Sequence, residues 1–296
     1  MAEEQALKNT NLNVNNRGAE ITLYWLETSR SHRILWLLED LQLSYTLKTF
    51  KRTADHLAPA HLKDVHPLGK SPIVTIQGGQ GGQGQSQSPL VLAESGAIIE
   101  YLCDHFGGDR AGLVPKRYDH HRERESNDQN QDQDRDQDRD QDQDQLLLVG
   151  SETEAWLRYR YYMHYAEGSL MSLLIVAYFV TSIKSAPVPF FIKPITRMIT
   201  GKIESVYLNE NLNTHFSFLE SQIQSAPDGG PFLCGRHLTA ADIFMSFPLI
   251  AVSGRSTISR QQYPAVFAYV DRLKEADGYK RAVAKIIEVD GSFQDV

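Results

Sequence analysis

A repetitive acidic tract divides the chain into two parts that can fold. Residues 117–145 end in an Asp-Gln and Asp-Arg repeat with almost no apolar side chains. Eight Asp from Asp128 to Asp144 face only Arg135 and Arg139, a net charge of -6 in the repeat. Such a segment buries too little apolar surface to offset the entropy lost on ordering. We therefore predict a disordered acidic linker over residues 109–150, with a folded unit on each side.

The charges outside this repeat nearly cancel. The whole chain of 296 residues carries a formal net charge of -7, which leaves about -1 for the rest. A nearly neutral folded part has no electrostatic footprint for a polyanion, so nucleic-acid binding is not expected. The two cysteines, Cys103 and Cys234, are too few for a disulfide framework or a zinc site, and we predict no metal.

The chain shows no signal for secretion or for crossing a membrane. Its first 20 residues contain no apolar signal segment. The longest apolar stretch, Leu170–Val180, is too short to span a bilayer. We expect a cytoplasmic protein with no integral membrane segment.

Residues 19–108 have the pattern of a small α/β unit. Strands are expected at Ile21–Trp25, Tyr45–Phe50, Ile73–Ile76 and Leu90–Ala93, with the last two forming a hairpin. Helices are expected at Ser31–Leu41, Ala60–Val65 and Ser95–Phe106. The order is β-α-β-α-β-β-α. Residues 1–18 are expected to be a disordered tail, and the Gly/Gln/Ser-rich residues 78–89 a low-complexity loop insert.

Residues 151–291 have helical periodicity throughout. A long aromatic helix is expected over Trp156–Val180, ending before two prolines at Pro187 and Pro189. Further helices are expected at Ile195–Val206, Asn213–Ser225, Ala240–Val252, Tyr263–Glu275 and Tyr279–Ile287. The predicted fold class is therefore α/β plus all-α, with a helical-bundle domain following the mixed unit.

The segment His66–Val74 enters a strand through Ser71-Pro72. A cis bond there would force a sharp turn and leave the Ser71 N–H and C=O unpaired by the sheet. Those groups could then pair with an extended peptide, as an added strand does. The alternative is an ordinary proline at the start of a strand, where its missing N–H costs nothing.

The segment Leu92–Ile99 ends a strand and begins a helix at Ser95. The first N–H groups of a helix favour a carboxylate, and Glu94 beside them can accept from an ammonium group. Together they suit the head of an α-amino acid, which carries both charges. The alternative is that Ser95 only caps the helix.

Both segments, in this order behind a β-α-β unit, resemble the cytosolic glutathione S-transferases. Pro67–Pro72 resembles their cis-proline loop, and Glu94-Ser95 resembles their γ-glutamyl-binding pair. The resemblance implies a thioredoxin-like N-terminal domain, a homodimer, and glutathione as co-substrate with no other cofactor.

Three further segments extend the resemblance along the chain. Gly235–Ile243 resembles the helix-start motif of the family's second domain, with Thr239 and Asp242 spaced as a capping box. Ser29–Leu38 and Arg158–Ser169 are similar to a fungal group of the family, the Gtt1-like transferases. Because a relative in that group is associated with the endoplasmic reticulum, the resemblance leaves the same association open for this protein.

The implied chemistry is attack by the glutathione thiolate on a hydrophobic electrophile, as in detoxification and the stress response. Lowering a thiol pKa from about 8.5 by roughly two units requires about 2.7 kcal/mol. One hydrogen bond to a charged group supplies about 1.5–3 kcal/mol. A single hydroxyl near the first helix is therefore sufficient. Ser29 is the predicted activator and Tyr24 the alternative, while Ser31 is expected to be the helix N-cap.

The remaining site residues are assigned by position. Lys70, Ser71, Pro72, Glu94 and Ser95 are predicted to bind glutathione. Tyr161 and Tyr165, on one side of the long aromatic helix, are predicted to line the electrophile pocket. Two other functions stay open: a non-catalytic glutathione-binding regulatory protein of the same fold, and a glutathione-dependent peroxidase.

Overall fold

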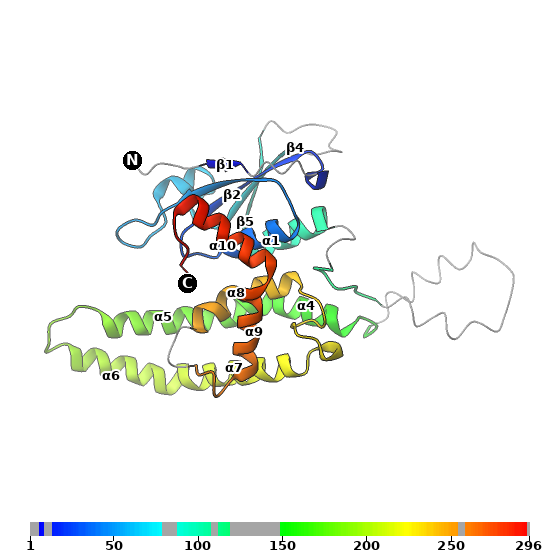
Figure 1. Ribbon diagram of the computed structural model, residues 1–296. Coiled ribbons are helices and arrows are strands. Elements are labelled where there is room, and N and C mark those ends of the chain that lie inside the picture. The colour runs from blue at the N-terminus through cyan, green and yellow to red at the C-terminus, as the bar shows by residue number, and fades with distance from the viewer. Residues whose placement is uncertain are drawn as a thin grey trace, which may run out of the picture.

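The computed structural model describes residues 6–8, 14–78, 88–107, 112–118, 149–253 and 258–294. An α/β unit lies against one side of an elongated helical unit (Figure 1). Most of the acidic linker and of the 78–89 insert lies outside the described residues, so the predictions for these segments stay predictions.

A mixed sheet with the strand order β1-β3-β2-β4-β5 forms the centre of the N-terminal unit. The four predicted strands are present as β2 (Ala19–Leu26), β3 (Tyr45–Phe50), β4 (Ile73–Gly78) and β5 (Leu90–Ala93). Strand β3 runs parallel to β2, and β4 and β5 form the predicted antiparallel hairpin. The predicted order β-α-β-α-β-β-α and the thioredoxin-like fold class are thus confirmed.

Within the expected disordered tail, the structure describes residues 6–8 and 14–18, and these are ordered. Ala6–Lys8 form β1, which pairs antiparallel with β3 at the sheet edge. The Asn16 amide donates to the carbonyls of Ala19 at 3.0 Å and Ser44 at 2.7 Å. Composition did not reveal this because an edge strand pairs through its backbone and needs no apolar run.

The helices of this unit pack as predicted. They are α1 (Ser31–Asp40), the short 3₁₀ helix η2 (Ala60–Asp64) and α2 (Ser95–Leu102), which continues as a wider π-type turn, η3 (Cys103–Gly107). Helix α1 buries Ile34, Leu35 and Leu38 in the same core as Leu23 and Trp25 of β2.

Two long rods form the base of the helical unit. The first joins α4 (Glu154–Tyr165), the wide turn η5 (Ala166–Met171) and α5 (Ser172–Ser185). The second joins α6 (Lys193–Ile203), η6 (Glu204–Leu208) and α7 (Asn209–Gln224). The second rod corrects the prediction of two separate helices. The asparagines in the middle of this rod indicate a helix break from sequence alone. In the structure the helix continues, because Leu208 and Leu212 are buried there.

Three more helices complete the unit: α8 (Ala240–Ser253), α9 (Pro264–Glu275) and α10 (Asp277–Asp290). The predicted structural role of the 235–243 motif is confirmed at the start of α8. There the buried Asp242 accepts from the Thr239 N–H at 2.7 Å, the Tyr269 hydroxyl at 2.6 Å and the Leu233 N–H at 3.0 Å.

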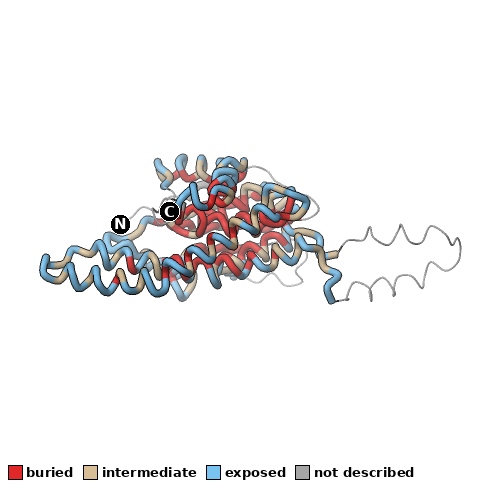
Figure 2. Tube along the Cα trace, turned by 90° about the horizontal axis from the view of Figure 1, so that it is seen from below, coloured by how far each residue is buried: buried red, intermediate tan, exposed pale blue. Residues whose placement is uncertain are grey.

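The C-terminal helix α10 returns to the N-terminal unit and packs on α1 (Figure 1). The contact is close at Gly278, where an added Cβ would lie 1.9 Å from Asp40 Oδ1 and 2.7 Å from Trp36 Cδ1. Buried residues fill the centre of the helical unit, whereas the far end of α5 and α6 is mostly exposed (Figure 2). The two units therefore share one core, from which the α5–α6 end projects.

Candidate active site

The strand register brings three loops to one end of the sheet. Tyr24 of β2 is paired with Ile73 of β4, which is paired with Ala93 of β5. Beyond this row lie the turn that carries Ser29, the Ser71-Pro72 segment and the Glu94-Ser95 helix start. The two predicted halves of the glutathione site are thus neighbours, with Ser29 at the same end.

Ser29 lies in a buried turn between β2 and α1. Its hydroxyl donates to the Leu26 carbonyl at 2.7 Å and accepts from the Ser31 N–H at 3.2 Å. Ser31 is not the N-cap expected from sequence: the helix follows Arg30, with no side-chain cap. The Ser29 proton is thus directed at the Leu26 carbonyl, and its donation to another acceptor requires the hydroxyl to rotate away from that carbonyl.

A chain of three hydroxyls links this turn to the proline loop. The Ser29 hydroxyl is hydrogen-bonded to that of Ser31, and the Ser31 and Ser71 hydroxyls are 2.8 Å apart. The Ser71 hydroxyl donates to the Tyr24 carbonyl at 2.9 Å. The two loops are therefore held at a fixed separation.

Arg52 braces the turn from the other side. Its guanidinium donates to the carbonyls of Glu27 at 3.2 Å, Thr28 at 3.0 Å and His56 at 3.0 Å. Thr28 itself has a φ of 44°. These bonds hold a left-handed residue directly before Ser29, where the backbone would otherwise relax.

The proline loop offers an unpaired backbone segment. The Ser71–Pro72 bond is cis, and the β4 ladder begins only at Ile73. Ser71 therefore lies outside the strand pairing, beside the exposed Lys70.

The second half of the cradle is strained. Glu94 is exposed and has a φ of 70°, which is rare for a residue with a side chain. Ser95 is the first residue of α2, not its cap, and it is buried. Such backbone strain is concentrated at functional sites, where surrounding structure maintains it. The first-turn N–H groups of α2 have no acceptor within the helix.

Tyr24 lies on the opposite face of the sheet from α1. Its ring stacks on Phe50 at 6.2 Å in a small cluster with Leu26 and Ile73, and Lys48 lies 5.5 Å from the ring centroid. This placement disfavours Tyr24 as the group that contacts a thiol beside Ser29.

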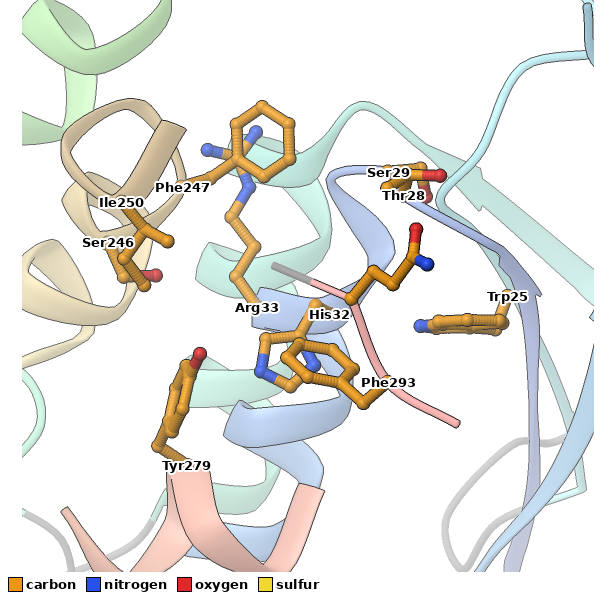
Figure 3. A pocket seen from close by; sticks show the side chains of 11 residues that line it. Trp25, Thr28, Ser29, His32, Arg33, Ser246, Phe247, Ile250, Tyr279 and Phe293 are labelled. Carbon is orange, nitrogen blue, oxygen red and sulfur yellow. The ribbon is translucent and has the colours of Figure 1, made fainter. Parts of the chain in front are cut away.

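A pocket opens beside Ser29 between the two units (Figure 3). Its walls come from the β2–α1 turn, α1, α8, α10 and the C-terminal segment: Trp25, Thr28, Ser29, His32, Arg33, Ser246, Phe247, Ile250, Tyr279, Phe293 and Gln294. The Phe293 ring lies 4.6 Å from that of His32. Sequence reasoning missed the walls from α8, α10 and the C-terminal segment because they lie more than 200 residues from Ser29 and no local pattern links them.

Trp25 places a polar atom without a partner among the described residues in the wall of this pocket. The residue is 3% exposed, and its indole N–H is buried with no acceptor among the described residues. Figure 3 shows the indole nitrogen directed toward Phe293. A buried donor of this kind is costly unless a ligand or water satisfies it.

The predicted electrophile residues Tyr161 and Tyr165 stack at 5.4 Å and line a different, open groove with Leu157, His164 and Gly168. Tyr165 is buried and hydrogen-bonded to His215 at 2.6 Å. Ser29 does not line this groove. The structure brings the two tyrosines together but not with Ser29, so their role stays a prediction.

A buried charge cluster joins the units behind the site. Arg33 of α1 pairs with Glu167 of η5 and donates to the Phe244 carbonyl at 3.0 Å. Arg30 lies 3.5 Å from the same Glu167 carboxylate. Burial lowers the pKa of Arg33 to about 10, and Glu167 opposes this effect. One carboxylate thus pairs with two cations beside the Ser29 turn.

Neither cysteine is an activated nucleophile. Burial raises the pKa of the Cys103 and Cys234 thiols to about 12. Among the described residues, no group of three His, Cys, Asp or Glu could hold a metal ion.

These features define a class of protein: a thioredoxin-like unit joined to an all-helical unit, with a polar cradle at one end of the sheet. Residues 29–105 match the glutathione S-transferase N-terminal domain, and residues 192–282 match its C-terminal domain. The chain belongs to the glutathione S-transferase family.

Individual relatives agree with this assignment. Glutathione S-transferase 1 of Saccharomyces cerevisiae is 29% identical over 92% of this chain and 98% of its own length. Glutathione S-transferase 3 of Schizosaccharomyces pombe is 26% identical over 90% of this chain and 88% of its own length. A solved glutathione S-transferase from Actinobacillus pleuropneumoniae has a TM-score of 0.59 and 27% identity, covering 93% of this chain and 94% of its own.

Proposed function

We propose that this protein conjugates the glutathione thiolate to hydrophobic electrophiles in the cytoplasm, as a homodimer. The observation that supports this most is the convergence of Ser29, Ser71 and Glu94-Ser95 at one sheet end. The backbone of Ser71 pairs with the peptide backbone of glutathione. The α2 start receives the γ-glutamyl carboxylate, and Glu94 receives its ammonium group. Lys70 is exposed beside them and offers a cation to a carboxylate of the tripeptide.

Ser29 then donates its hydroxyl proton to the sulfur. The Ser31 N–H and the hydroxyl chain hold the Ser29 oxygen in place, and the Ser29 proton turns from the Leu26 carbonyl to the sulfur when glutathione binds. A hydrogen bond to the anionic sulfur favours the thiolate over the thiol and lowers its pKa. The Ser29 proton is shared with the sulfur and not transferred, and the thiol proton leaves to solvent.

The pocket beside Ser29 is the place we propose for the electrophile. Phe247, Tyr279 and Phe293 offer aromatic walls, and the Trp25 indole N–H offers one directional donor. The cavity holds only about 20 Å³, so a planar aromatic electrophile that carries a hydrogen-bond acceptor, such as a nitro or carbonyl group, enters by moving these side chains apart.

The test is retention on immobilised glutathione, followed by an aryl-halide conjugation assay on the eluted protein. The proposal expects retention, elution by free glutathione, and turnover. Absence of retention would contradict it. Retention without turnover would support the non-catalytic binding protein, and turnover only of a hydroperoxide would support the peroxidase.

A further inference from the structure

The end of the α5–α6 hairpin is unusually apolar for an exposed surface. Residues 175–207 hold eleven large hydrophobic side chains that are at least 38% exposed. They are Ile175, Tyr178, Phe179, Ile183, Phe190, Phe191, Ile195, Met198, Ile199, Val206 and Tyr207. A patch of this density on a soluble domain marks an interaction surface.

The most exposed of these side chains, Phe190, lies at the turn between the two helices. Phe190 is 83% exposed and its neighbour Phe191 65% exposed, directly after Pro187 and Pro189. Figures 1 and 2 both show α5 and α6 running side by side away from the rest of the molecule. The apolar surface thus belongs to the protruding α5–α6 hairpin and is neither a groove nor a flat face.

The charge of the hairpin is opposite in sign to that of the whole chain. Residues 175–208 contain Lys184, Lys193, Arg197 and Lys202 but only one acid, Glu204, a net charge of +3 within a chain of net -7. Glu204 pairs with Lys184 at 2.9 Å. Lys193, Arg197 and Lys202 are exposed and form no ion pair with a described residue. Three cations therefore surround the exposed aromatic and aliphatic side chains.

We propose that the tip of the α5–α6 hairpin docks on an anionic lipid surface. Aromatic side chains settle at the boundary between headgroups and acyl chains, while neighbouring lysines and arginines contact anionic headgroups. The same charge disfavours the alternative occupant, the hairpin of a second copy, because two such tips would bring like charges together.

The geometry indicates a shallow contact and not a spanning helix. By length and composition the rod Glu154–Ser185 could cross a membrane, and 33% of its most apolar stretch is buried. The first half of this rod, α4, packs against α8 in the core, however. Only α5 is therefore available to enter a membrane. The 14 residues of α5 extend about 21 Å, less than the roughly 30 Å of a hydrocarbon core.

Vesicle flotation of the full-length protein tests this inference. Neutral phosphatidylcholine vesicles are compared with vesicles that also contain roughly 30 mol % phosphatidylserine. We expect binding to the anionic vesicles, weakened by salt and weak on the neutral ones. Phe190→Ser/Phe191→Ser and Lys193→Gln/Arg197→Gln should each reduce binding about ten-fold or more.

The matched control is Leu57→Ser/Val149→Ser, which removes two exposed apolar side chains elsewhere. It should bind vesicles like the wild type, and circular dichroism should show every variant folded. No binding by the wild type, or unchanged binding by the folded tip variant, would overturn the inference. So would a tip variant that turns a dimer into a monomer without affecting vesicle binding. None of these readouts depends on glutathione turnover.

Discussion

At the scale of single residues, the site consists of groups whose surroundings fix their direction. Ser29 is oriented by the Ser31 N–H, and Glu94 by a strained backbone between β5 and α2. Sequence placed both at the right end of the sheet because a strand followed by a helix puts the connecting loop there. The sequence did not reveal that the Tyr24 side chain lies on the face of the sheet opposite α1. Which face each strand residue takes is known only once the strand's pairing register is known.

Glu94→Gln tests the γ-glutamyl end of the cradle. The variant keeps the size of the side chain but removes the charge that we assign to the ammonium group. A charged hydrogen bond contributes about 1.5–3 kcal/mol, so KM for glutathione should rise about ten-fold or more. With saturating glutathione, kcat should change little. Asp64→Asn, a surface carboxylate, is the control, and an unchanged KM in Glu94→Gln would argue against this role.

Asp40→Asn tests a buried carboxylate outside the site. Burial raises the pKa of Asp40 to about 6, although the Trp36 N–H at 2.8 Å and Arg281 oppose this. Because the folded pKa lies above the unfolded value of about 3.9, Asp40 lowers stability as pH rises from about 4 to 6. The free energy of unfolding of Asp40→Asn, relative to wild type, should therefore increase over that range. Two pKa units set an upper limit of about 3 kcal/mol.

Urea denaturation of both proteins at several pH values measures this difference. The exposed Glu288→Gln is the control and should show a much smaller pH-dependent change. A difference that stays constant from pH 4 to pH 7 would contradict the raised pKa.

At the scale of elements, sequence predicted the regular parts well and the junctions poorly. The strand Tyr45–Phe50 and the start of α1 at Ser31 agree because each has a strong apolar period and clear flanking residues. The rod from α6 to α7 was divided in two, since Asn209 and Asn211 are weak helix formers that tertiary packing overrides. Strand β1 was missed because backbone pairing leaves no signal in composition.

Gly278→Ala tests the contact between α10 and α1. The added methyl group would overlap the Asp40 carboxylate and the Trp36 ring, which are part of a buried helix pair. Overpacking of this kind costs about 1–3 kcal/mol, which should lower the free energy of unfolding accordingly. Gly168→Ala, where nothing lies within 4 Å of the new Cβ, is the control. A Gly278→Ala protein as stable as the wild type would contradict the close packing.

At the scale of the whole molecule, the proposed active site depends on contacts between the two units. The pocket walls Phe247, Tyr279 and Phe293 come from the helical unit, while Ser29 comes from the turn between β2 and α1. Such long-range contacts carry no sequence signal in a single chain. The predicted wall, Tyr161 and Tyr165, followed a local aromatic pattern and lies in another groove.

Glu167→Gln tests the coupling of the two units. The change leaves Arg33 buried without a counter-charge, and removing one partner of a buried pair costs about 3–5 kcal/mol. Because Glu167 is itself one-third exposed, the loss should lie near the lower end. Urea denaturation should show it, with Glu154→Gln, the exposed partner of Arg158, as the control. Equal stability of the two variants would contradict a stabilising role of the Arg33–Glu167 pair.

The pKa of the glutathione thiol bound to the enzyme tests the central claim most directly. It is measured by titrating the ultraviolet absorbance of the thiolate in the binary complex, for wild type, Ser29→Ala and Tyr24→Phe. The account predicts a pKa roughly two units below the usual value of about 8.5 in wild type and Tyr24→Phe, and a return toward that value in Ser29→Ala. A pKa that Ser29→Ala leaves unchanged, while glutathione still binds, would contradict it.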